Sequence, residues 1–186
     1  TSRLTWPRLK TSRRMAASRN IVLTGFMGTG KSAVASELAR LTGLRRIEVD
    51  DEIERAAGMS ISEIFAQYGE SRFREMETQE IRRIAARAGQ IISTGGGAVM
   101  NPENMEALGE TGVIVNLTAR PETVLNRTAR NSDRPLLDVP DPMKKIEELL
   151  AVRKPFYDKA DFMVDTEGKT PLEIAREILE LTRWKS

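Results

Sequence analysis

The sequence predicts an α/β protein in which a five-stranded parallel sheet is covered by helices on both faces, giving three layers. The first observation behind this prediction is that short apolar runs typical of buried strands alternate with helical patterns. The second is that residues 25–32, between the first such run and the first helical pattern, match G-x-x-x-x-G-K-[ST]. The third is the length of 186 residues, which suits one domain with a proper core.

Each element has its own signal in the sequence. The predicted strands are the apolar runs at residues 21–24, 46–49, 90–93, 113–117 and 162–164. Helical patterns cover residues 33–41, 60–67 and 70–87, and further helices begin at Pro121 and at Thr170, the latter running to Trp184. Capping boxes open the helices at Ser60 and Thr170. Residues 130–142 are polar and contain prolines, which indicates a mobile loop within a single domain of residues 20–186.

Residues 25–32 carry the clearest chemistry in the sequence. Glycines let the backbone curl so that successive N–H groups point at phosphate oxygens, and the following helix adds the positive end of its dipole. Lys31 can then reach the β- and γ-phosphates, and the Ser32 hydroxyl can ligate Mg²⁺. The alternative is a glycine-rich turn with a chance lysine. The strand and helix on either side favour nucleotide binding.

The composition excludes several kinds of chemistry. The chain has no cysteine and no histidine, so disulfides, thiolate metal sites and imidazole bases are impossible. Catalysis must use carboxylates, lysine, arginine and an oxygen-bound metal. No apolar run approaches the length of a membrane span, and a reducing cytoplasm is the expected location.

The net charge of +2 comes from the first residues. Residues 1–14 contain five basic side chains and no acidic one, whereas the rest of the chain has 24 Lys and Arg against 27 Asp and Glu. We therefore expect residues 1–19 to be a disordered basic leader, whether an upstream extension or a targeting segment. The body lacks a basic stripe interleaved with aromatic residues, so nucleic-acid binding is not expected.

Acidic and glycine-rich segments follow two of the predicted strands. Glu48 and Asp50 end the second strand on the same side, where they could hold Mg²⁺ or accept a proton from an alcohol. The alternative is that these acids begin the next helix. Residues 95–97 are three glycines after a buried strand, and such a backbone can approach a ligand closely.

Three arginines are weaker candidates when each is taken alone. Taken alone, the pattern around Arg74 favours a solvated ion-pair face, and Arg153 gives no stronger sign of function. Arg134, followed by Pro-Leu-Leu in the predicted loop, suggests a lid that docks on a ligand, with an ordinary surface turn as the alternative. The strand before the glycines lacks a terminal aspartate, and no Asn-Lys-x-Asp is present; both absences argue against nucleotide-dependent switch proteins.

Taken together, these segments resemble the shikimate kinase family over residues 20–181. The resemblance depends on the order of the Gly-Phe-Met-Gly-x-Gly-Lys-Ser loop, the acidic pair ending at Asp50, Phe73-Arg74-x-x-Glu77, the three glycines, and Arg134-Pro-Leu-Leu with Arg153 downstream. It implies a P-loop kinase fold with a lid near residues 130–142. One departure is Glu48, where the family usually has aspartate.

The resemblance also implies a role for each site residue. Shikimate would be bound by Asp50, Arg74, Gly95, Gly96, Gly97, Arg153 and Glu77. ATP would be bound by Gly28, Thr29, Gly30, Lys31, Ser32, Ala33, Arg127, Arg134, Lys169 and Pro171, with Arg127 and Pro171 beside the adenine. The catalytic residues would be Lys31, Asp50 and Arg134, and Ser32 and Glu48 would hold Mg²⁺.

The expected activity is phosphoryl transfer from MgATP to the 3-hydroxyl of shikimate by a monomer. Arginines suit this acceptor because their paired N–H groups match a carboxylate. One alternative is another acid-sugar kinase of the same fold, such as a gluconate kinase. A nucleotide-binding regulatory module is the alternative from a different class.

Overall fold

The computed structural model describes residues 19–129, 137 and 139–183. In this part of the chain the strands β1 (Asn20–Gly25), β2 (Arg45–Glu48), β3 (Gln90–Ser93), β4 (Gly112–Thr118) and β5 (Phe162–Asp165) form one sheet. The strand order is β2-β3-β1-β4-β5 and every pairing is parallel. The predicted five-stranded parallel sheet is confirmed.

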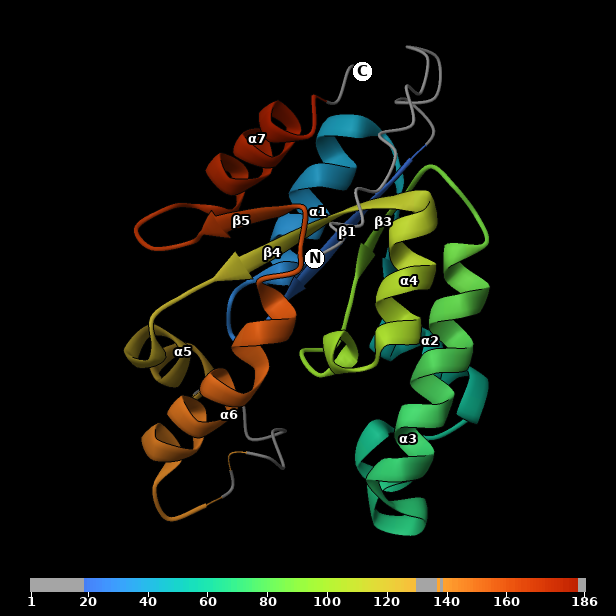
Figure 1. Cartoon of the computed structure of the whole chain (residues 1–186), viewed down its shortest axis with the longest axis vertical. Coiled ribbons are helices and arrows are strands. Elements are labelled where there is room, and N and C mark those ends of the chain that lie inside the picture. Colours follow the sequence, from blue (N-terminus) through green and yellow to red (C-terminus); the bar gives the residue numbers. More distant parts are fainter. Residues whose placement is uncertain (1–18, 130–136, 138, 184–186) are drawn as a thin grey trace, which may run out of the picture.

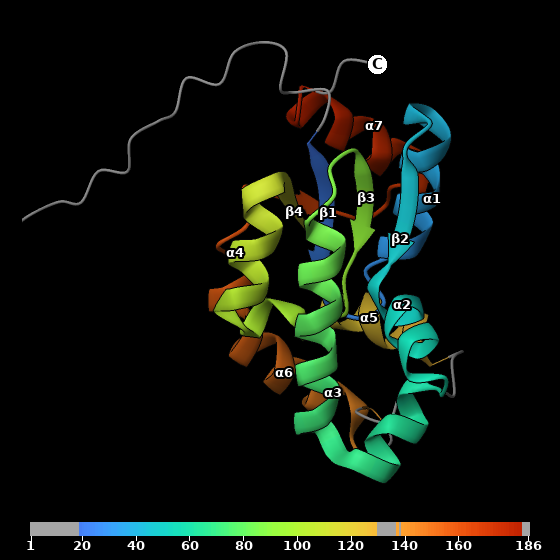
Figure 2. The same cartoon turned by 90° about the vertical axis from the view of Figure 1, so that its right-hand side faces the viewer.

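Helices cover both faces of this sheet (Figures 1 and 2). On one face lie α1 (Lys31–Thr42) and α7 (Pro171–Leu181), and on the other α3 (Ile61–Ala85) and α4 (Pro102–Thr111). Side chains of β1 alternate between the two cores: Ile21 and Leu23 pack with α1 and α7, and Val22 packs with α3 and α4. Burial on both faces explains why the three central strands, β1, β3 and β4, read as apolar runs.

A third group of elements lies beyond the carboxyl ends of the strands. It comprises α2 (Val49–Ala57), the short helix η2 (Ala98–Met100), α5 (Pro121–Thr128) and α6 (Pro142–Tyr157). Phe26 and Met27 of the loop after β1 pack here against Val124 of α5 and Ile146 of α6. The loop after β1 therefore packs into a separate small core. This core lies at the edge of the sheet where parallel α/β proteins bind ligands.

The second strand begins and ends one residue earlier than predicted. It ends at Glu48, and Asp50 lies in the first turn of α2. The prediction that Asp50 extends the strand is wrong, and the helix-start alternative is right. Asp50, Asp51 and Glu52 all stand in this first turn, where negative charge suits the helix dipole.

The predicted helices 60–67 and 70–87 are joined as α3, with a sharp bend at Gly69, where φ is +79°. The two capping boxes are confirmed at Ser60 and Thr170. The pattern missed α4 and α6, although Asn101-Pro102 and Asp141-Pro142 each supply an N-cap followed by proline.

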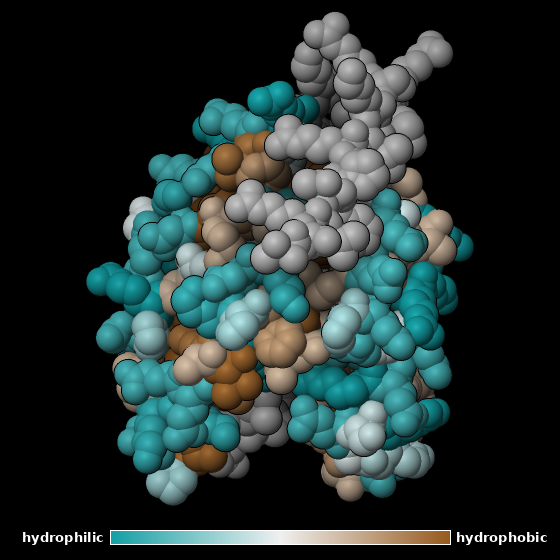
Figure 3. Space-filling view, in the orientation of Figure 1, coloured by the Kyte–Doolittle hydropathy of each residue, from teal (hydrophilic) through white to brown (hydrophobic). Residues whose placement is uncertain are grey.

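Some predictions fall outside the described residues. They are the leader up to residue 18, most of the lid segment 130–142 with Arg134, and Trp184. No helix in the described ranges combines the length and apolar character needed to cross a membrane. The face seen in Figure 3 is mainly hydrophilic, with small separate hydrophobic patches.

Candidate functional site

The loop between β1 and α1 has the curled backbone that phosphate binding requires. Gly28 and Gly30 adopt φ values of +78° and +90°, which glycine tolerates and side-chain-bearing residues rarely adopt. No side chain caps α1, so its first turn presents N–H groups to an anion. Lys31 Nζ donates to the carbonyls of Gly25 (2.8 Å) and Phe26 (2.9 Å), which holds the ammonium over the loop.

A cavity of about 390 Å³, the phosphate cavity, opens at this loop. The predicted ATP-binding residues that line it are Gly28, Gly30, Lys31, Ser32, Ala33 and Arg127. Arg127 Nη1 donates to Gly28 O (3.2 Å) and to Thr166 Oγ1 (3.3 Å), so α5 and the segment after β5 meet at the loop. The cavity combines a cationic lysine with helix N–H groups, which suits a polyphosphate.

Two side chains whose oxygens could ligate a metal ion lie at one wall of this cavity. Ser32 Oγ donates to Glu48 Oε2 at 3.1 Å, and Glu48 Oε1 is buried without a hydrogen bond, 3.8 Å from Arg46 Nε. Adjacent ligands of an octahedral Mg²⁺ stand about 3 Å apart, given Mg–O distances of about 2.1 Å. Within the described ranges no cluster of three or more acidic residues could hold a metal. The pair therefore fits a Mg²⁺ ion that is also held by phosphates and water.

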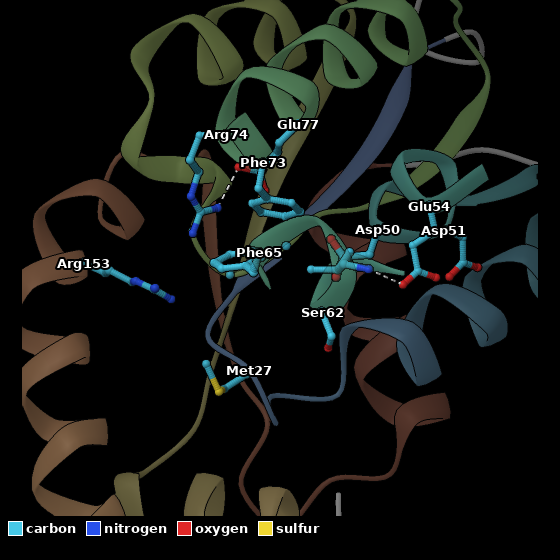
Figure 4. Close-up of a pocket in the computed structure, with 14 residues that line it drawn as sticks. Met27, Asp50, Asp51, Glu54, Ser62, Phe65, Phe73, Arg74, Glu77 and Arg153 are labelled. Atoms are coloured by element: carbon cyan, nitrogen blue, oxygen red, sulfur yellow. Dashed lines mark hydrogen bonds and ion pairs between the residues drawn. The ribbon is translucent and has the colours of Figure 1, made fainter. Parts of the chain in front are cut away.

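A second cavity of about 310 Å³, the acceptor cavity, lies beside the first, between α2, α3, the three glycines and α6 (Figure 4). Arg74 projects into it from α3 and Arg153 from α6, with Asp50 of α2 on another side. Phe65 and Phe73, whose ring centroids are 4.9 Å apart, form an apolar wall. This arrangement suits a small organic acid with an apolar ring face.

Arg74 is held in place by its own helix. Its Nη1 donates to Glu77 Oε2 at 2.8 Å and its Nη2 to Glu70 Oε1 at 3.1 Å, and the guanidinium carbon lies 5.1 Å from the Phe73 ring centroid. The guanidinium is therefore fixed in orientation before a ligand arrives. Such preorganisation reduces the entropy that binding would otherwise cost.

Glu77 is the buried partner of this arginine. Glu77 is 1% exposed, and its Oε1 has no hydrogen-bond partner among the residues that the structure describes. Burial raises the pKa of Glu77, nearby Asp50 raises it further, and the charges of Arg74 and Arg153 act in the opposite direction. The raised pKa means that the folded protein binds a proton here more readily than the unfolded chain.

This predicts a pH-dependent stability difference between the native protein and Glu77→Gln. The stability that a group with a raised pKa contributes is fully present below its unfolded value of 4.5 and is lost as pH rises through the folded value. The native protein should therefore lose stability relative to Glu77→Gln from pH 4.5 upward. Urea unfolding of both proteins at several pH values measures this difference. A pH-independent difference would contradict it.

The three glycines allow the charged side chains to reach the backbone. A Cβ on Gly95 would lie 3.0 Å from Glu77 Oε1 and 3.1 Å from Asp50 Oδ1. A Cβ on Gly97 would lie 2.5 Å from Arg74 Nη2. Arg74, Glu77 and Asp50 thus occupy the space that side chains at Gly95 and Gly97 would fill.

Gly97→Ala should displace Arg74 without unfolding the protein. Gly97 has helical dihedral angles (φ −94°, ψ −9°) that alanine also adopts, so the conflict is with the movable guanidinium. We expect acceptor affinity to fall about tenfold, equivalent to about 1.4 kcal/mol. Gly109→Ala is the control, because a Cβ there would meet only Ile114 Cδ1 at 3.8 Å. Calorimetric titration with the acceptor measures both, and equal affinities would contradict the prediction.

Arg153 forms the opposite side of the acceptor cavity. It is 4% exposed, and its guanidinium carbon lies 5.4 Å from the Phe26 ring centroid. Within the described part of the chain its Nε has no hydrogen-bond partner. A Cβ on Gly96 would be 3.3 Å from its Nη1. A buried guanidinium that faces a cavity with unused donor capacity is suited to a carboxylate ligand.

The two cavities share part of their walls. Met27, Asp50, Gly95 and Gly96 line both of them. Asp50 therefore stands where a molecule held by the two arginines would meet a phosphate held by the loop. This common wall is the geometry that group transfer between two bound molecules requires.

The structure places the remaining predicted residues differently. Thr29 is not among the residues that line the phosphate cavity, and its hydroxyl donates to Phe26 O at 2.8 Å. Lys169 Nζ pairs with Glu177 at 2.7 Å, and Pro171 begins α7; both follow Thr166, which Arg127 contacts. The roles of Arg134, Lys169 and Pro171 stay predictions.

Sequence reasoning gave no role to three residues that shape the acceptor cavity. Met27 and Phe65 line it, and Tyr157 contacts Gly96. Met27 stands inside the phosphate-loop pattern at a variable position, and the helix that carries Tyr157 was not predicted. The i, i+4 spacing of Arg153 and Tyr157 was the available signal.

Comparison with known proteins decides between the kinases that this geometry allows. A family model described as shikimate kinase matches residues 27–183. The chain belongs to the shikimate kinase family. Shikimate kinase of Thermodesulfovibrio yellowstonii is 48% identical over 87% of this chain and 94% of its own. Shikimate kinase of Geobacter sulfurreducens is 46% identical over 89% of this chain and 91% of its own.

Solved structures agree with this membership. A shikimate kinase from Acinetobacter baumannii in complex with shikimate superposes with a TM-score of 0.86 and 37% identity, covering 92% of this chain and 96% of that one. A gluconokinase from Sinorhizobium meliloti has a TM-score of 0.55 and 19% identity, over 89% and 91% of the two chains, a likeness of fold alone. The shikimate kinase family, and not the gluconate kinases, is thus the family of this chain.

Proposed function

We infer that the protein transfers the γ-phosphoryl group of ATP to the 3-hydroxyl of shikimate. Family membership supports the reaction type and the acceptor. The observation that carries the inference within this molecule is the wall that the two cavities share. An acid held by Arg74 and Arg153 would present its hydroxyl next to Asp50, beside the phosphate-binding loop.

The proposed roles follow from position. Lys31 neutralises charge on the transferring phosphoryl group, because it stands over the loop whose N–H groups cradle phosphates. Asp50 orients the acceptor hydroxyl and takes its proton. Arg74 and Arg153 bind the acceptor carboxylate and so fix the hydroxyl in line with the phosphate.

We further propose that Mg²⁺ is required and is held by Ser32 and Glu48 together with ATP. The support is the 3.1 Å separation of their oxygens and the buried, unbonded Glu48 Oε1. Bound Mg²⁺ supplies positive charge to the phosphates. A monomer in the cytoplasm is also proposed. The absence of cysteine supports the reducing compartment, and sedimentation velocity tests the oligomeric state.

An assay of ADP release with a panel of acceptor alcohols tests the function. Shikimate should strongly stimulate ADP release and yield one phosphorylated product per ADP, whereas gluconate and water should not. The stimulation should vanish when EDTA removes Mg²⁺. Preference for gluconate, or a rate of ADP release that no acceptor changes, would refute the proposal.

A further inference from the structure

Tyr157 is the last residue of α6 and connects this helix to the three glycines. Its residue is 5% exposed and packs in the same core cluster as Phe26, Val124 and Ile146. Its hydroxyl donates a hydrogen bond to the carbonyl oxygen of Gly96 at 2.7 Å. The packed ring fixes where the hydroxyl stands, so this bond ties the glycine segment to the rigid end of α6.

Arg153 precedes Tyr157 by one turn of α6, and its guanidinium lies beside Gly96, because a Cβ on Gly96 would be 3.3 Å from Arg153 Nη1. Burial raises the pKa of the Tyr157 hydroxyl, and the charge and hydrogen bonding of Arg153 partly counter this effect. The hydroxyl is therefore protonated at neutral pH and donates to Gly96.

Gly96 depends on this bond more than another residue would. The segment 95–97 contains only glycines, whose peptide planes rotate more freely than those of other residues. Gly96 and Arg153 both line the acceptor cavity, whereas Tyr157 does not. One hydroxyl outside the cavity thus contacts Gly96 at the point where the Arg153 guanidinium lies beside it.

We propose that Tyr157 is a positioning residue for acceptor binding: its hydroxyl fixes the Gly96 peptide and the Arg153 guanidinium relative to each other. The proposal rests on the proposed function, because it names what holds that acceptor site in shape. It assigns Tyr157 no contact with either substrate. Loss of the hydroxyl should therefore affect the acceptor and leave ATP binding unchanged.

Tyr157→Phe tests this by removing one oxygen atom. KM for shikimate should rise about tenfold, the effect of one lost buried hydrogen bond, while kcat and KM for ATP stay within about twofold. Tyr68→Phe is the matched control, because Tyr68 is the other tyrosine of the chain and is 57% exposed. An unchanged KM for shikimate, or a fall in kcat alone, would overturn the proposal.

Hydrogen exchange separates this inference from the proposed function, because it needs no substrate. In Tyr157→Phe, amides of residues 95–98 should exchange faster, including Ala98, which donates to Gly95 O at 3.2 Å. Amides of β1 and β4 should be unaffected. Uniformly faster exchange would mean a general stabilising role and would overturn the proposal. A native chain inactive on shikimate would refute the function alone.

A second measurement covers the case in which Tyr157→Phe does not fold. In the Tyr68→Phe background, incorporated 3-fluorotyrosine places a single fluorine at position 157, since the chain has two tyrosines. Addition of shikimate should shift this fluorine resonance, because the carboxylate of the acceptor would bind Arg153, one helical turn before Tyr157. A resonance that ignores saturating shikimate would overturn the proposal.

Discussion

Arg153→Ala should weaken shikimate binding by about 150-fold, or about 3 kcal/mol, while ATP affinity stays nearly unchanged. The guanidinium is 4% exposed, so a carboxylate bound to it is shielded from water and the interaction is strong. Arg153 lines the acceptor cavity and is not among the residues that line the phosphate cavity. Calorimetric titration of the variant with shikimate and with ATP measures both affinities.

The control for this variant is Arg120→Ala. Arg120 pairs with Glu167 at 3.2 Å, but its side chain is 74% exposed, so its removal should change neither affinity. If Arg153→Ala loses ATP and shikimate affinity to the same extent, the arginine supports the fold of the whole cleft. Its assignment to the acceptor would then fail.

Asp50→Asn should lower kcat by about 100- to 1000-fold, the range of a lost general base. The amide retains the size of the carboxylate but cannot take the proton of the attacking hydroxyl. ATP binding should persist, because the carbonyls of Gly25 and Phe26 still hold Lys31 over the phosphate-binding loop. Single-turnover measurement of product formation separates the chemical step from substrate binding.

Asp165→Asn makes the same change at the end of β5. Asp165 is exposed, and its side chain accepts a hydrogen bond from Glu167 N at 3.0 Å, which asparagine can also accept. This control should retain full turnover. Turnover of Asp50→Asn equal to that of the control would exclude Asp50 from the chemistry.

The sequence was sufficient where one short segment holds both the signal and the chemistry. Residues 25–32 predict their own loop, because the glycines and the following helix act locally. The three central strands, β1, β3 and β4, were also readable, since burial on both faces leaves apolar runs. Asp50 was placed on the wrong element because strand ends and acidic helix starts have similar local patterns.

The acceptor site depends on tertiary contacts that no local pattern contains. Arg74 resembled an ordinary surface arginine in the sequence, since its i, i+3 and i, i+4 acidic neighbours are typical of a solvated helix. Only packing shows that one neighbour, Glu77, is 1% exposed and that the guanidinium lies against Gly97. Arg153 is separated from Arg74 by 79 positions in the sequence and meets it across one cavity.

The sequence by itself determined the layered α/β fold and the phosphate-binding loop, because hydrophobic periodicity and glycine spacing act over a few residues. The tertiary structure decided which arginines face each other, which carboxylate is buried, and that Tyr157 holds Gly96. These properties depend on how α3, α6 and the glycines pack together. The charged side chains lose contact with water, and their pKa values shift, only after that packing has formed.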